Sequence, residues 1–102
     1  MSDLGQKFDL LYQQWYNDTM MISNMTTILL HPSHLRIIGM GKDALPFILQ
    51  KMADDPGSGH WFSALDAIVD DSPKELDEAH NDGRKMRDIW VKWGKERGYI
   101  TN

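Results

Sequence analysis

Apolar side chains recur every three or four residues along most of the chain, and this spacing limits the fold more than any other sequence feature. A period of 3.6 residues places such side chains on one face of an α-helix. The pattern occupies residues 4–21, 43–53, 60–69 and 84–97, and it is clearest in Leu4, Phe8, Leu11 and Trp15. No stretch of useful length alternates with the period of two that a half-buried strand requires. The sequence therefore predicts an all-α fold.

Proline and glycine divide these stretches into short helices. A short helix is expected at residues 23–30, with Ser23 as its N-cap. Pro32 ends this helix, because the residue before a proline avoids helical geometry. The same proline suits the first turn of the next helix, which Gly39 and Gly41 would end. We therefore expect two short helices in this part of the chain.

Capping signals mark the remaining helices. Asp43 is the expected N-cap of the helix at 43–53, and Ser58 that of the helix at 60–69. Ser72 and Glu75 have the spacing of a capping box, which predicts a further short helix. Gly98 would end the last helix. These signals predict a compact bundle of five to six short helices.

The composition fits a single domain, residues 1–102, with 41% hydrophobic residues and no cysteine. The lack of cysteine excludes disulfides and thiolate metal sites, and it favours a reducing, cytoplasmic location. Residues 1–7 lack the apolar core of a signal peptide, and the longest strongly apolar run, 28–30, is far too short to span a bilayer. We expect no membrane association and no cofactor.

The order of several short motifs resembles a family of small, uncharacterised helical bacterial proteins. The match covers roughly residues 15–99. The residues concerned are Trp15 with Asp18-Thr19, His31-Pro32, Ile37-Ile38-Gly39-Met40-Gly41, Leu45-Pro46, Ile48-Leu49, His60-Trp61-Phe62, Ala64-Leu65, Ala67-Ile68, Pro73, Trp90, Trp93-Gly94 and Gly98. The resemblance implies a bacterial or phage-type cytosolic origin and no particular activity.

The centre of the chain also resembles a HEAT-type helix pair. Within residues 41–70, a glycine precedes a helix with an early proline, Pro46, and a short loop leads to a helix carrying Ala64-Leu65. HEAT units normally stack in threes or more, so one unit implies an architecture only, a HEAT-like helical hairpin. By analogy of fold, such pairs most often bind other macromolecules.

Charge is distributed unevenly along the chain. Residues 1–52 have a net charge of zero, residues 53–83 of −8, and residues 84–102 of +4. An acidic middle beside a basic end indicates either a basic partner or mutual neutralisation in the fold. Arg84 and Lys85 begin the last helix, where positive charge opposes the helix dipole, so we expect them to pair with the acidic segment or with an anion.

Three histidines are the candidate metal ligands. His31 and His34 are spaced i, i+3, and His60 or a carboxylate would have to complete the site. No third ligand lies at a recognised spacing, and His31 before a proline has an alternative role in capping the turn. The sequence therefore predicts no metal site.

Acidic pairs are the candidate binding residues. Carboxylate pairs catalyse reactions only in a pocket that separates their pKa values, whereas these belong to loops and helix starts, where solvated acids are common. An exposed tryptophan beside them would make a good contact for a protein partner. The expected partner-binding residues are Asp54, Asp55, Trp61, Asp70, Asp71, Asp77 and Glu78.

These observations lead to one functional hypothesis and one main alternative, and a small enzyme or metal protein centred on His31, His34 and His60 ranks below both. The first is a non-enzymatic protein-binding module whose acidic stretch, residues 54–82, covers a basic surface on a protein partner, as antitoxins and immunity proteins do. The alternative is a nucleic-acid-associated accessory protein that uses the basic last helix. The overall charge of −4 and the lack of a recognisable helix-turn-helix favour the first.

Overall fold

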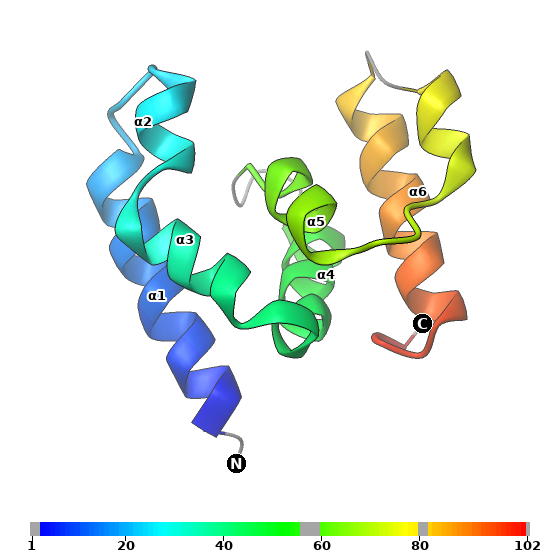
Figure 1. The fold of residues 1–102 in the computed structure, drawn as a ribbon, viewed down its shortest axis with the longest axis horizontal. Coiled ribbons are helices and arrows are strands. Elements are labelled where there is room, and N and C mark those ends of the chain that lie inside the picture. Colours follow the sequence, from blue (N-terminus) through cyan, green and yellow to red (C-terminus); the bar gives the residue numbers. More distant parts are fainter. Residues whose placement is uncertain (1–2, 56–59, 80–81, 102) are drawn as a thin grey trace.

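The computed structural model describes residues 3–55, 60–79 and 82–101. Over these residues the fold is all-α, as predicted, and contains no strand. Figure 1 shows α1 to α3 on one side of the molecule, α6 on the other, and α4 and α5 between them. The elements are α1 (Asp3–Thr19), α2 (Met25–Leu29), α3 (Pro32–Gly39), the 3₁₀ turn η1 (Gly41–Ala44), α4 (Leu45–Asp54), α5 (Phe62–Ile68), the 3₁₀ turn η2 (Lys74–Glu78) and α6 (Gly83–Glu96).

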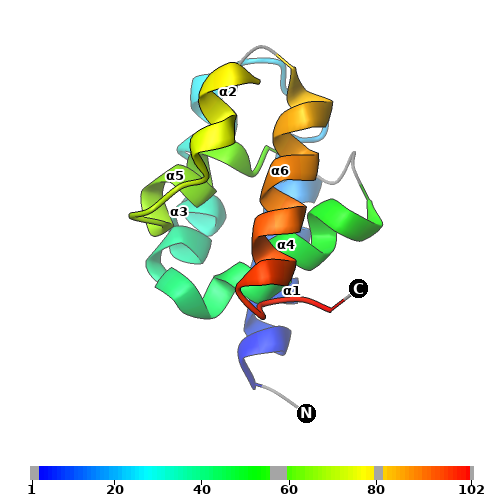
Figure 2. The ribbon, with the colours of Figure 1, turned by 90° about the vertical axis from the view of Figure 1, so that its right-hand side faces the viewer.

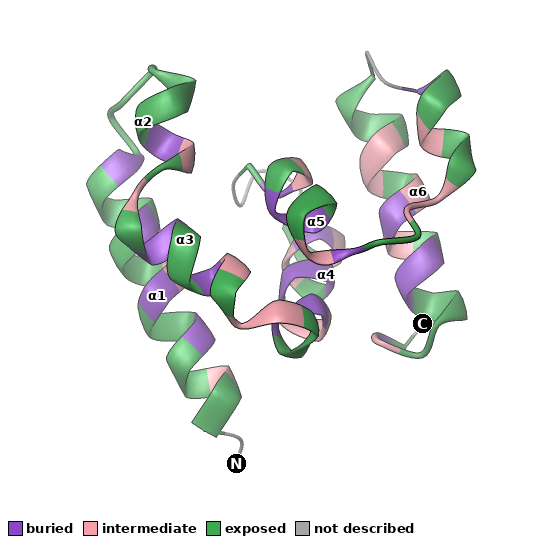
Figure 3. Ribbon diagram, viewed as in Figure 1, coloured by how far each residue is buried: buried purple, intermediate pink, exposed green. Residues whose placement is uncertain are grey.

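One apolar face holds α1 in place. Phe8, Leu11 and Trp15 are buried on it, as their spacing predicts, and α3 is the main element against which α1 packs. Leu4 was predicted on the same face but is 41% exposed. The reason is visible in Figure 3, where the first turn of α1 projects beyond the buried part of the molecule.

The cap of α2 differs from the prediction by one residue, and α3 has a cap of an unusual type. Asn24, rather than Ser23, caps α2 by accepting a hydrogen bond of 3.0 Å from the Thr27 backbone N–H. His31 caps α3, and its Nδ1 accepts from the Ser33 N–H at 3.0 Å. Asparagine and serine are equally good N-caps, so composition alone could not choose between neighbours.

The start of α4 also differs from the prediction. Gly41 has φ of +65°, a conformation that glycine reaches without steric cost, and the chain then forms η1 before α4 begins at Leu45. Asp43 therefore lies within η1 and does not cap α4, whose N-cap position, Ala44, makes no side-chain hydrogen bond. The proline at the beginning of α4 lies in its first turn, as expected.

The segment between α5 and α6 forms a 3₁₀ turn. Pro73 occupies the N-cap position of η2, and no side chain caps it, so the predicted capping box of Ser72 and Glu75 is wrong. α5 begins at Phe62, two residues later than expected. Its predicted cap, Ser58, lies outside the described residues.

Tryptophans anchor α6 against the middle of the molecule. Trp90 and Trp93 are buried, and Gly94 faces α4 so closely that a Cβ atom there would lie 2.8 Å from Leu49 Cδ1. Gly98 has φ of +80° just after the helix, as predicted for its C-terminal glycine. The close contact between α4 and α6 therefore depends on Gly94, which has no side chain, next to the buried ring of Trp93.

The predicted HEAT-like hairpin is not confirmed. α4 and α5 follow one another in the expected order, separated by a short link. The most extensive contacts of α4 are with α6, whereas those of α5 are with α3. The two helices are therefore joined to the fold mainly through other elements.

Replacing Arg87 with methionine is expected to lower the free energy of unfolding by about 1–3 kcal/mol. The Arg87 side chain closes the end of α4: Nε donates to the Met52 carbonyl at 2.8 Å and Nη2 to the Ala53 carbonyl at 3.4 Å. These carbonyls have no partner within the helix, because they belong to its last turn. Urea denaturation followed by circular dichroism measures the loss.

Asp88→Asn is the matched control for this variant. Asp88 accepts from Arg87 Nη1 at 2.7 Å, but its side chain is 63% exposed, so the pair contributes little. We expect a loss of at most about 1 kcal/mol from Asp88→Asn. Equal losses in the two variants would show that the ion pair, and not the contact with α4, matters.

Candidate functional site

Four of the predicted binding residues lie on the segment from the end of α5 through η2. Asp70, Asp71, Asp77 and Glu78 are all exposed. Pro73 precedes the 3₁₀ turn η2, which packs along one side of α6 (Figure 1). The structure therefore presents a short acidic surface, here called the η2 acidic surface and defined by these four residues.

One member of the η2 acidic surface is neutralised within the fold. Arg97 Nη2 donates to Asp71 Oδ2 at 2.6 Å, and both side chains are about half exposed or more. This hydrogen bond, helped by the charge of Arg97, holds the pKa of Asp71 below its ordinary value of 3.8. The charge of Asp71 is therefore balanced within the fold. Among the described residues, no ion pair involves Asp70, Asp77 or Glu78.

The other two predicted acids lie elsewhere. Asp54 ends α4 and accepts a hydrogen bond from Gln50 Nε2 at 3.0 Å. Asp55 is close to Tyr12 on α1, where its charge adds to burial in raising the pKa of the tyrosine. Figure 2 shows the end of α4 and η2 on opposite sides of α6. The acidic stretch is therefore divided into two surfaces.

Trp61 belongs to the core and not to an exposed contact surface. It is 2% exposed, and its ring lies 4.9 Å from that of Trp15 and 5.9 Å from that of Phe8. Trp61 was predicted to be exposed because it lies near acidic loops in the sequence, but the sequence does not show which way its ring points. Its neighbour Phe62 is the half-buried member of the pair.

The three histidines lie close together but do not form a metal site. His31 uses both ring nitrogens, because Nδ1 accepts the Ser33 N–H and Nε2 lies 2.9 Å from Asp18 Oδ2. His34 is fully buried and its Nδ1 donates to the Leu29 carbonyl at 2.9 Å. Across the described residues, no group of three or more His, Cys, Asp or Glu side chains is arranged to hold a metal ion.

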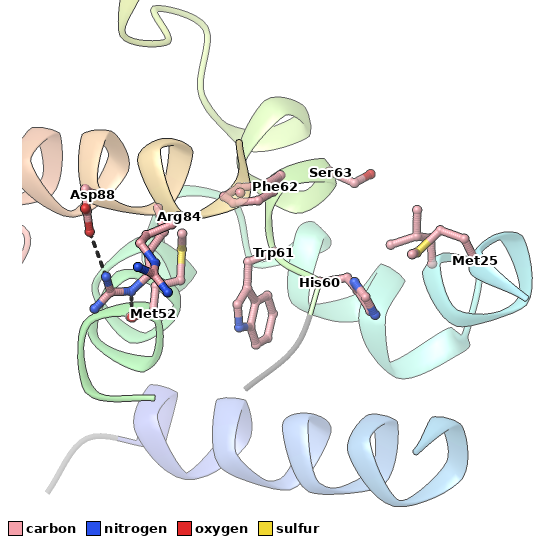
Figure 4. A pocket seen from close by; sticks show the side chains of 11 residues that line it. Met25, Met52, His60, Trp61, Phe62, Ser63, Arg84 and Asp88 are labelled. Atoms are coloured by element: carbon pink, nitrogen blue, oxygen red, sulfur yellow. Dashed lines mark hydrogen bonds and ion pairs between the residues drawn. The ribbon is translucent and has the colours of Figure 1, made fainter. Parts of the chain in front are cut away.

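A groove that the sequence did not reveal lies between α2 and the start of α6. Its volume is about 640 Å³. Met25 and Leu29 line it from α2, Phe62 from α5 and Arg84 from α6. Figure 4 shows Met25 and Arg84 at opposite ends, with Trp61 between them. The only sequence signal for this site was the positive charge of Arg84 and Lys85 at the start of the last helix, where it opposes the helix dipole.

The basic residues of α6 and its C-cap residue, Arg97, fall into two groups. Arg87 and Arg97 contact other parts of the fold. Four other cations are exposed and share one face of the helix, and none of them forms an ion pair within the described residues. They are Arg84, Lys85, Lys92 and Lys95. The predicted pairing of Arg84 and Lys85 with the acidic segment is therefore not seen, and Arg97 pairs there instead.

Comparison with known proteins identifies no relative. No protein-family model matches the sequence, and neither a curated protein nor a solved structure shows significant similarity to it. The resemblance to a bacterial family thus stays a prediction. None of the described helices combines the length and apolar character needed to cross a membrane.

Proposed function

We propose that this chain is a non-enzymatic protein-binding module that uses the η2 acidic surface to contact a basic surface on its partner. The observation that carries the proposal is that Asp70, Asp77 and Glu78 are exposed and take part in no ion pair within the described residues. Like charges on a short exposed segment repel one another and create a negative surface potential, which attracts an opposite charge. A partner with a basic surface would supply that charge.

Antitoxins and immunity proteins are the closest functional model for such a module. They are small acidic proteins that cover a cationic surface, and complementary charge raises the rate at which the two proteins meet. The lack of cysteine favours a reducing compartment, and a cytoplasmic setting of that kind agrees with this model. Asp54 and Asp55 lie on the other surface, so they would contact this partner only if it extended around α6.

Neutralising the η2 acidic surface is expected to abolish partner capture. The variant is Asp70→Asn, Asp77→Asn and Glu78→Gln combined, and it should fold normally because all three side chains are exposed. The tagged wild-type protein should retain one stoichiometric protein from a lysate of the source organism at moderate salt. The triple variant should lose it, and mass spectrometry reads the result.

A matched control separates this surface from overall charge. Asp3, Asp9 and Asp43 are exposed acids on α1 and η1, and changing all three to asparagine alters the net charge by the same amount. The control should keep the partner. Equal retention by both variants, or no stoichiometric partner at all, would remove the proposal.

Nucleic-acid binding through α6 is the second candidate, favoured by the exposed basic face of Arg84, Lys85, Lys92 and Lys95. Contacts to phosphates would make the affinity for a random duplex fall steeply as salt is raised. Fluorescence anisotropy with a labelled duplex at 50 and 200 mM salt tests this. A flat salt response, or no binding at the lower salt, excludes it.

A further inference from the structure

The groove between α2 and α6 has an apolar end and a cationic end, and the proposed protein-binding function does not use it. The apolar end is formed by Met25 and Leu29 of α2, with Phe62 along one wall. Met25 is 46% exposed, although it lies in a concave surface. Methionine side chains are flexible and polarizable, so they adapt to the shape of an apolar ligand.

At the cationic end of the groove, the guanidinium of Arg84 forms no ion pair with any described residue. Arg87 lines this end too, but it donates to the Met52 and Ala53 carbonyls and pairs with Asp88. Its charge is therefore balanced by the one acid that lines the groove, since the other described lining residues include no carboxylate. Arg84 is exposed and forms no ion pair within the described residues, which leaves the groove with a net positive charge at this end.

We propose that the groove binds an amphiphilic monocarboxylate, a small molecule with an apolar chain or ring that ends in a carboxylate. The carboxylate pairs with Arg84, whose planar guanidinium suits a carboxylate, and the apolar part runs along the half-buried Phe62 toward Met25. Figure 4 shows that this order of side chains follows the length of the groove.

The size and chemistry of the groove support this ligand class. A volume of about 640 Å³ lies within the range of small-molecule sites, which are mostly apolar with a few polar groups that fix orientation. A neutral ligand would leave Arg84 without a counter-charge, and a cationic one would be repelled. The inference is independent of the η2 acidic surface, so either proposal can fail alone.

Decanoate, kept below its micelle concentration, is the test ligand. Methyl-labelled methionines report its position by NMR, because Met25 and Met52 line the groove whereas Met40 does not. We expect saturable shifts of the Met25 and Met52 methyl signals and none at Met40. Met21, which is 90% exposed on another segment, reports non-specific association with the detergent-like chain.

Head-group and side-chain variants test the role of Arg84. Arg84→Gln should weaken decanoate binding at least about fivefold, the effect of losing one charge-assisted pair at a partly exposed site. Lys92→Gln, an exposed cation on the same helix face, should leave the affinity unchanged within about twofold. Decylammonium should bind more weakly than decanoate.

Three results would overturn the proposal. The first is equal binding of decanoate and decylammonium, or of decanoate by the wild-type protein and Arg84→Gln. The second is a Met21 shift as large as the Met25 shift, which means non-specific association. The third is a change of the Met25 and Met52 signals when the protein alone is diluted, which would assign the groove to a second copy of this chain.

Discussion

Trp15→Ala is expected to lower the free energy of unfolding by about 3–5 kcal/mol, the usual cost of removing a buried tryptophan ring. Trp15 is 2% exposed and lies at the centre of the packing between α1 and α3. Its ring is 4.7 Å from that of His34 and 4.9 Å from that of Trp61. Small domains have a total stability of about 5–15 kcal/mol, so this variant should lose a large fraction of its stability and unfold at a clearly lower urea concentration.

Trp15→Phe separates the hydrogen bond of this residue from its packing. Trp15 Nε1 donates to the Ile28 carbonyl at 2.9 Å and thereby ties α1 to α2. Phenylalanine retains the six-membered ring but removes the rest of the indole and leaves the carbonyl without this donor, so a loss of about 1–3 kcal/mol is an upper limit for the hydrogen bond. Urea denaturation of both variants measures the two losses. A loss below about 1 kcal/mol for Trp15→Ala would show that the ring is not packed as described.

The same residue illustrates which parts of the fold the sequence could predict. The spacing of Phe8, Leu11 and Trp15 was enough to predict that they share one helix face, because a buried face requires apolar residues at the helical period. The hydrogen bond to Ile28 has no local signal, since it joins residues 13 apart through a turn. Several predictions of helix starts were wrong for a related reason. Several adjacent residues could act as caps, and packing chose among them.

The candidate site shows a similar division between local and tertiary information. Exposure of Asp70, Asp77 and Glu78 followed from local composition, because short polar segments cannot be buried cheaply. The separation of Asp54 from these acids depends on how α4 crosses α6, which no local pattern records. The groove draws residues from α2, α5 and α6, so it exists only after those helices have packed.

His34 makes the stability of the fold sensitive to acid. The ring is fully buried, its Nδ1 donates to the Leu29 carbonyl, and Nε2 has no hydrogen-bond partner among the residues that the structure describes. Burial lowers the pKa of His34 from its ordinary value of 6.5. Smaller effects act on the same pKa. The backbone of Leu29 and His60 raises it, and the nearby charges of His31 and His60 lower it. The folded protein therefore holds this ring neutral.

Acidification below pH 6.5 should therefore destabilise the protein. In the unfolded chain His34 takes up a proton near its ordinary pKa, whereas the folded chain takes it up only at lower pH. The contribution is fully present above pH 6.5 and is lost as the pH falls toward the lowered value. The steepest slope from one group is about 1.4 kcal/mol per pH unit. Urea denaturation at several values between pH 5 and 7.5 measures it.

His34→Gln is the variant that isolates this group. It removes the titrating ring but retains His31 and His60, so a difference in slope between the variant and the wild-type protein belongs to His34. Asp71 does not interfere, because its pKa is held below 3.8 and its pair is lost only at more acidic pH. We expect the variant to be less stable at pH 7.5 and to lose less stability on acidification. Parallel pH profiles for the two proteins would show that His34 is not held neutral, and a wild-type protein that gains stability below pH 6.5 would contradict its burial.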